Sequence, residues 1–136
     1  GDFGTAHFVI DNAGATVVGT IEPLSIEEIE WQLGVNLWGV INGTQAFAPH
    51  MVERGRPGLV INTGSKQGIT TPPGNPAYNV SKAGVKALTE ALQHELRNIP
   101  GCKISAHLMI PGHVFTGLHH RRLTGRVCGV ARPRKM

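Results

Sequence analysis

The chain has 136 residues, of which 40% are hydrophobic, and a formal net charge of +4. This length suits one domain with its own core and gives no support for two. Its hydrophobic residues occur in short runs, which excludes a disordered chain, and no run approaches the roughly 18 residues of a membrane-spanning helix. Because the N-terminus also lacks the layout of a signal peptide, a cytoplasmic location is the default expectation.

The cysteines and histidines give no sign of a metal site. Cys102 and Cys128 lie far apart and form no CxxC pair, so neither a structural zinc nor an oxidising compartment is indicated. None of the seven histidines has a partner at the spacing of a recognised metal motif. We therefore predict no bound metal.

The positive charge is concentrated at the C-terminus. Residues 1–120 contain seven Lys or Arg and nine Asp or Glu, whereas residues 121–136 contain six basic residues and no acid. We interpret residues 1–120 as the globular part of the chain and residues 121–136 as an atypical basic tail. Such a tail can contact nucleic acid or anionic lipid, but without interleaved aromatic residues a solvated terminus is the preferred interpretation, with neither nucleic acid nor membrane as a partner.

The first half predicts a strand followed by two helices. The run "HFVID", residues 7–11, is typical of a short buried strand. Ser25 and Glu28 form a capping-box pattern that begins a helix reaching about Leu33. Apolar residues at helical spacing then predict a second helix over residues 36–54.

The second half predicts a strand, a helix and a strand. The apolar run at residues 58–64 is the next strand, and residues 65–75 are a loop rich in Gly, Thr and Pro. Pro76 suits the first position of a helix that runs to about Arg97, and residues 103–110 are the last strand. Small and apolar residues at intervals of three and four predict the packed face of this helix: Val80, Ala83, Gly84, Ala87, Leu88, Ala91 and Leu92.

Strands that alternate with long helical connections predict an α/β protein with a parallel sheet. In such sheets ligands bind beyond the carboxyl ends of the strands. In this chain those ends are followed by Asn12-Ala13-Gly14, by Ser65 and by Pro111-Gly112. The candidate functional residues are therefore expected at one edge of the sheet.

Tyr78 and Lys82 carry the clearest chemical signal. A spacing of four places a phenol and an ammonium on the same side of a helix, one turn apart. A lysine ammonium held beside a tyrosine lowers the phenol's pKa from its ordinary value of about 10, so that the phenol can act as a general acid or base. Taken alone, the pair is a weak signal, and a half-buried structural tyrosine beside a solvated lysine is the preferred interpretation, so the context of the pair decides.

That context resembles the short-chain dehydrogenase/reductase family of NAD(P)-dependent oxidoreductases. The matching motifs occur in family order over roughly residues 3–118: "NAG" after a strand, "VNLWGV", Ser65 after a strand, "YNVSK" and "IPGHVFT". Each motif alone is weakly specific, but together they are specific. The resemblance implies a Rossmann-like fold and hydride transfer between a nicotinamide cofactor and an alcohol or carbonyl compound.

The resemblance also implies four catalytic residues. Ser65 would hold the substrate oxygen, and Tyr78 would transfer the proton. Lys82 would assist Tyr78 and hold the nicotinamide ribose, and Asn36 would order a water that links Lys82 to solvent. By itself, Asn36 could instead merely cap or kink its helix.

The expected cofactor is NAD or NADP, and the sequence does not discriminate between them. In the family the turn after the first of these strands lies along the adenosine side, and the segment after the last strand lines the nicotinamide carboxamide. The residues implied in cofactor binding are Asn12, Ala13, Gly14, Tyr78, Lys82, Pro111, Gly112, Val114 and Thr116.

The chain departs from the family in its glycines. No two of its eighteen glycines are separated by a single residue, so the G-x-G turn that receives the cofactor pyrophosphate is absent. We therefore expect a partial doubly wound parallel sheet that lacks the first βαβ phosphate-binding unit, as in an N-terminally truncated member of the family. Residues 1–120 would then be the C-terminal catalytic part of a Rossmann-type dehydrogenase domain.

Two functions stay open. One is the oxidoreductase activity implied by the resemblance. The alternative is an inactive fragment that acts, if at all, as an oligomerisation partner. In either case the two long helices, at about residues 36–54 and 77–97, resemble those through which family members commonly form dimers.

Overall fold

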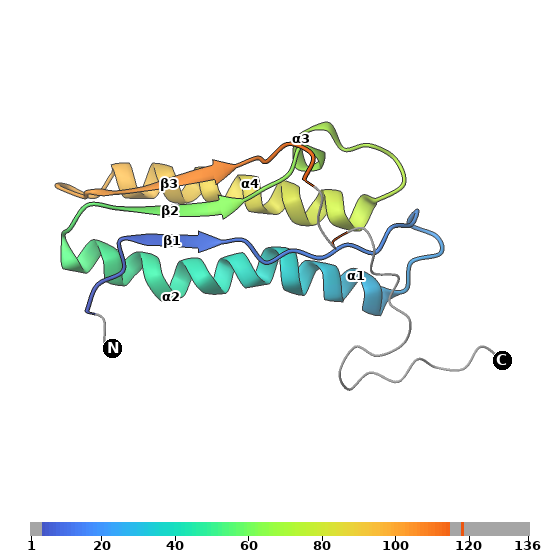
Figure 1. Cartoon of the computed structure of the whole chain (residues 1–136), viewed down its shortest axis with the longest axis horizontal. Helices are drawn as coiled ribbons and strands as arrows, with labels where there is room; N and C mark the ends of the chain where they lie inside the picture. Colours follow the sequence, from blue (N-terminus) through green and yellow to red (C-terminus); the bar gives the residue numbers. More distant parts are fainter. Residues whose placement is uncertain (1–3, 115–117, 119–136) are drawn as a thin grey trace.

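The computed structural model describes residues 4–114 and residue 118. Within them, β1 (Phe8–Asp11), β2 (Gly58–Thr63) and β3 (Ile104–Met109) form one parallel sheet in the order β1-β2-β3. The α/β class and the parallel sheet are thus confirmed. The strand arrows point toward the same end of the sheet, where α3 and the start of α4 lie (Figure 1).

A continuous helical segment connects β1 to β2. It consists of α1 (Ile26–Leu33), the π-helix η1 (Gly34–Trp38) and α2 (Gly39–Arg54). Ser25 and Glu28 form the predicted capping box: the Ser25 hydroxyl accepts the Glu28 N–H, and the Glu28 carboxylate accepts the Ser25 N–H. The sequence pattern predicts two helices and misses the wide turn between them, because periodicity does not report which carbonyl each N–H bonds.

The connection from β2 to β3 contains α3 (Gln67–Thr70) and α4 (Pro76–Arg97). Pro76 begins α4, as predicted. The prediction of an uninterrupted loop over residues 65–75 is wrong, because α3 interrupts it. A helix of only four residues is too short to leave a periodic pattern in the sequence.

Both long helices pack on the same face of the sheet, α2 beneath β1 and α4 behind β2 and β3 (Figure 1). The core between them consists of side chains from both layers: Val9, Ala48, Met51, Val60, Leu96, Ile104 and Ala106. The opposite face carries Phe8 and Ile10, which are 67% and 58% exposed. No helix among the described residues covers that face, as expected for a sheet that lacks other βαβ units.

The predicted packed face of α4 is only partly correct. Val80, Ala87 and Ala91 are exposed, whereas Ser81, Lys82 and Thr89 are buried. The inward side of α4 meets polar groups of η1 and of β2, so hydrogen bonds replace apolar contacts there. This polar interior is the basis of the candidate site.

Candidate functional site

Tyr78 and Lys82 lie on the first two turns of α4, and both are buried, with exposed fractions of 8% and 4%. The Lys82 ammonium nitrogen is 5.8 Å from the centre of the Tyr78 ring. Its Nζ also donates a hydrogen bond of 3.0 Å to the main-chain carbonyl of Thr63, at the end of β2. The structural alternative of a solvated lysine is therefore wrong.

Burial determines the electrostatics of Lys82. Desolvation of the ammonium lowers the pKa of Lys82 below its ordinary value of 10.5. Within the described residues no carboxylate forms an ion pair with it. The main-chain carbonyl of Thr63, rather than an ion pair, therefore holds the Lys82 nitrogen.

Asn36 lies in the middle of η1 and has no exposed surface. Its Oδ1 accepts the Ala15 N–H at 2.7 Å, and its Nδ2 donates to the Ala15 carbonyl, also at 2.7 Å. The same Nδ2 donates to the Ser81 hydroxyl at 3.1 Å. Asn36 therefore ties the segment after β1 to α4.

The turn at residues 12–14 lies beside this group. A Cβ atom on Gly14 would be 3.7 Å from Asn36 Oδ1 and 3.8 Å from Lys82 Nζ. Asn12 is anchored separately, since its Oδ1 accepts a hydrogen bond of 2.9 Å from the Thr63 hydroxyl. Asn12, Ala13 and Gly14 are all exposed, so their surfaces are accessible to a ligand.

Ser65 follows β2 directly and is half-buried. Its hydroxyl oxygen accepts the Gln67 N–H at 3.2 Å. No hydrogen bond between described residues joins Ser65 to Tyr78 or Lys82. It is instead linked to them through α3, because Gly68 of that helix lies against the backbone of Lys82.

The residues after β3 reach the same edge of the sheet. Pro111, Gly112 and Val114 are exposed there, and a Cβ on Gly112 would meet no atom within 4 Å. Thr116 lies outside the described residues, as does the basic tail at residues 121–136. The structure thus brings Gly14, Asn36 and Lys82 together, with Tyr78 beside Lys82, and places Ser65 and the segment after β3 at the same edge of the sheet.

Two residues of this network have no role in the sequence interpretation. Thr63 supplies the carbonyl that binds Lys82 and the hydroxyl that binds Asn12. Ser81 supplies a hydroxyl to Asn36. Thr63 lies two residues before Ser65 and Ser81 directly before Lys82, but nothing in the sequence indicates that Thr63 faces the turn or that Ser81 faces η1.

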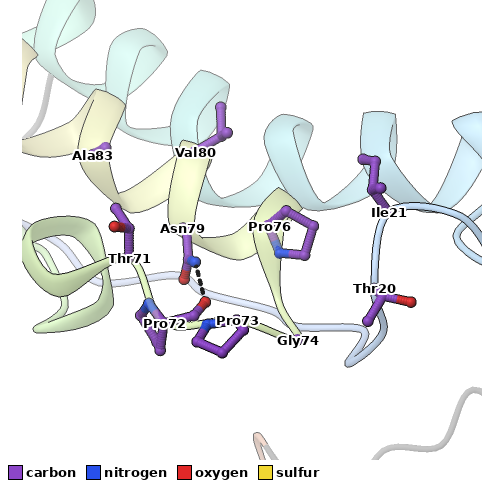
Figure 2. A pocket seen from close by; sticks show the side chains of 10 residues that line it. All are labelled: Thr20, Ile21, Thr71, Pro72, Pro73, Gly74, Pro76, Asn79, Val80 and Ala83. Atoms are coloured by element: carbon purple, nitrogen blue, oxygen red, sulfur yellow. Dashed lines mark hydrogen bonds between the residues drawn. The ribbon is translucent and has the colours of Figure 1, made fainter.

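An apolar groove of about 470 Å³ lies on a different side of α4. Figure 2 shows the loop at residues 71–74, the first turns of α4 and the loop at Thr20 and Ile21 around it. Asn79 fixes this loop by donating a hydrogen bond of 2.8 Å to the Pro72 carbonyl. Neither Tyr78 nor Lys82 lines the groove, so it is not part of the buried polar group.

Other classes of site find no support in the part of the chain that the structure describes. It contains no group of three or more His, Cys, Asp or Glu side chains arranged to hold a metal ion. None of its helices combines the length and the apolar character needed to cross a bilayer.

Comparison with known proteins agrees with the geometry. Residues 1–126 match a family model described as short chain dehydrogenase. The chain is 42% identical over 94 residues to SadH of Mycobacterium tuberculosis, a protein named as an oxidoreductase, and the match covers 69% of this chain and 34% of that protein.

Two solved structures are similar. A short chain dehydrogenase/reductase from Burkholderia phymatum in complex with NAD has a TM-score of 0.86 and 34% identity, over 98% of this chain and 48% of that one. A gluconate 5-dehydrogenase from Burkholderia cenocepacia in complex with NADP and tartrate has a TM-score of 0.78 and 28% identity. The match covers 85% of this chain and 44% of that one. The chain therefore spans less than half the length of these relatives.

Proposed function

Because the chain belongs to the short-chain dehydrogenase/reductase family of oxidoreductases, we propose that it carries the proton-transfer part of an enzyme that interconverts an alcohol and a carbonyl compound. Its three-stranded sheet is a partial Rossmann-like fold. The observation that carries the proposal is the buried Lys82 ammonium beside Tyr78, the only tyrosine of the chain.

In this proposal Tyr78 is the general acid or base. During carbonyl reduction its phenol donates a proton to the substrate oxygen, and during alcohol oxidation its phenolate accepts one. Lys82 stabilises the negative charge on the phenolate oxygen, because the ammonium lies close by and is shielded from water.

Ser65 positions the substrate oxygen in this scheme. Its oxygen accepts the Gln67 N–H, so its own proton remains available to donate to a carbonyl or hydroxyl oxygen. Asn36 holds the segment at Ala15 against α4 and so maintains the place beside Lys82. We assign the catalytic roles to Asn36, Ser65, Tyr78 and Lys82 on these contacts.

The described residues fit the nicotinamide ribose end of NAD or NADP. Of the three N–H donors of Lys82, one bonds Thr63, which leaves two for ribose hydroxyls. The exposed turn at Asn12, Ala13 and Gly14 lies beside that ammonium, and Pro111, Gly112 and Val114 follow β3 at the same edge. When bound, the nicotinamide supplies or accepts the hydride. The G-x-G turn for the pyrophosphate is not in this sequence.

Substitution of Tyr78 in the complete product of the gene, supplied with NAD or NADP and a panel of alcohols, tests the proposal. Tyr78→Phe is expected to lower kcat by about 10²–10⁴-fold, and Lys82→Met to lower it as well. Lys86→Met is the matched control, because Lys86 lies one turn further along α4 in an exposed pair with Glu90. Retained turnover of Tyr78→Phe at neutral pH would sink the proposal.

A second candidate is an oligomerisation partner without activity of its own. Apolar side chains project outward from η1, α2 and α4, where Trp38, Phe47 and Val80 are 57%, 46% and 58% exposed. Such exposed side chains favour a contact between copies through these helices. Co-purification with a longer relative, lost on substitution of Trp38 and Phe47 by Ser, would support this candidate, and failure to co-purify would remove it.

A further inference from the structure

Ser81 lies between Tyr78 and Lys82 in α4 and has no exposed surface. Its hydroxyl donates a hydrogen bond of 2.7 Å to the main-chain carbonyl of Tyr78. A buried serine that bonds a carbonyl of the preceding turn is common in helices and implies no function by itself. The second contact of this hydroxyl is the informative one.

The Ser81 oxygen accepts a hydrogen bond of 3.1 Å from Asn36 Nδ2. An asparagine amide has two N–H donors, and the other one bonds the Ala15 carbonyl. Asn36 Oδ1 accepts the Ala15 N–H. Ser81 therefore completes the hydrogen bonding of the Asn36 amide nitrogen and joins η1 to the turn of α4 that carries Tyr78 and Lys82.

This connection reaches the proposed reaction site. The place where a Gly14 Cβ would stand is 3.7 Å from Asn36 Oδ1 and 3.8 Å from Lys82 Nζ, so both groups border the same spot. We propose that Ser81 is a positioning residue, whose hydroxyl holds the Asn36 amide and the Tyr78–Lys82 turn in the relative placement that proton transfer needs. The proposal rests on the oxidoreductase function above.

Thr89 provides a matched control for substitution of Ser81. It lies on the same helix, is 2% exposed, donates from its hydroxyl to the Val85 carbonyl at 2.7 Å and accepts from Asn62 Nδ2 at 3.0 Å. Its contacts thus reproduce those of Ser81, but two turns further from Tyr78. A variant without the Thr89 hydroxyl loses the same kind of helix contact without touching the site.

The test compares Ser81→Ala with Thr89→Val in the complete product of the gene, with Ser81→Cys as a second variant that retains a weak donor. We expect Ser81→Ala to lower kcat about tenfold with the KM values for cofactor and alcohol within about twofold, and Thr89→Val to leave kcat within about twofold. Ser81→Cys should lie between Ser81→Ala and the unsubstituted protein. An equal loss of kcat in Thr89→Val, or an unchanged kcat in Ser81→Ala, would overturn the positioning role.

Hydrogen exchange distinguishes failure of the positioning role of Ser81 from failure of the proposed oxidoreductase function. The Asn36 side-chain amide protons, followed by NMR, should exchange slowly in the unsubstituted protein and faster in Ser81→Ala, whether or not the protein turns over. An unsubstituted protein without NAD(P)-dependent turnover overturns the oxidoreductase function. Equal exchange rates in the two proteins overturn the link through Ser81.

Discussion

A Cβ atom on Gly68 would lie 2.6 Å from the main-chain carbonyl carbon of Lys82 and 2.8 Å from its oxygen. The backbones of α3 and α4 are therefore in direct contact at the residue that carries the ammonium. Since α3 begins just after Ser65, this contact sets the distance between the end of β2 and Lys82. A side chain at residue 68 has no room unless one of the two helices moves.

Gly68→Ala should therefore destabilise the fold by about 1–3 kcal/mol, as other overpacked sites do. In an active parent protein it should also lower turnover, because Ser65 moves with α3. Gly34→Ala is the control, since a Cβ there meets no atom within 4 Å and its φ of −60° is helical. Unfolding in urea measures the stability of both variants. Equal stability of the two variants would show that α3 adjusts without cost.

Asn36→Asp tests the amide at the centre of the site. The substitution removes both N–H donors and leaves the Ala15 carbonyl facing a carboxylate oxygen in a fully buried position. We expect a loss of about 2–3 kcal/mol at neutral pH, because a buried acceptor loses its donor. Asn42→Asp, on the exposed side of α2, should have little effect in the same unfolding experiment. Comparable losses in the two variants would contradict the bonding described for Asn36.

Asp11 gives a prediction with a defined pH dependence. Its carboxylate packs against Gly43 of α2, and its Oδ2 is buried without a hydrogen-bond partner among the described residues. Burial raises the pKa of Asp11 above its ordinary value of 3.8. Between 3.8 and this raised value the folded state binds more protons than the unfolded state, so the Asp11 contribution to stability decreases as pH rises through that window.

Asp11→Asn removes this penalty. We expect the variant to be more stable than the unsubstituted protein at pH 7 by less than about 1 kcal/mol, because water screens part of the penalty on this partly exposed carboxylate. The difference should disappear at a pH below 3.8, where Asp11 is protonated in both states. Urea unfolding at both pH values measures it, with Glu22→Gln as the exposed control. A stabilisation that is equally large in acid would rule out the titration of Asp11 as its cause.

The sequence predicts the architecture well and the interior of the site poorly. The strands, the Ser25 capping box and the start of α4 at Pro76 follow from local patterns, because local backbone preferences cause them. The pairing of Tyr78 with Lys82 follows from helical spacing. These features need no knowledge of which elements meet.

The sequence does not predict the contacts between distant elements, because local backbone preferences do not determine them. Ser81 and Thr89 are polar residues outside the set of small and apolar residues that the sequence predicts as the packed face of α4, yet both are buried. Their partners, Asn36 and Asn62, are 45 and 27 residues away. Helical periodicity gives the angular position of a side chain but not the identity of the neighbour it meets, so a polar interior is read as a surface.

The open face of the sheet predicts association of the 136-residue chain. Phe8 and Ile10 project from β1 on the face that no described helix covers, and β1 is also an edge strand, whose outer N–H and C=O groups can pair with another chain. Burying one such side chain contributes about 1.5–3 kcal/mol, so both together favour contact between copies. Sedimentation velocity over a wide range of concentrations should show a mass that rises with concentration. Substituting Phe8 and Ile10 by Ser should reduce it, whereas Val18→Ser, at a loop residue that is 70% exposed, should not. A monomer at every concentration with a sharp, reversible unfolding transition would contradict the prediction.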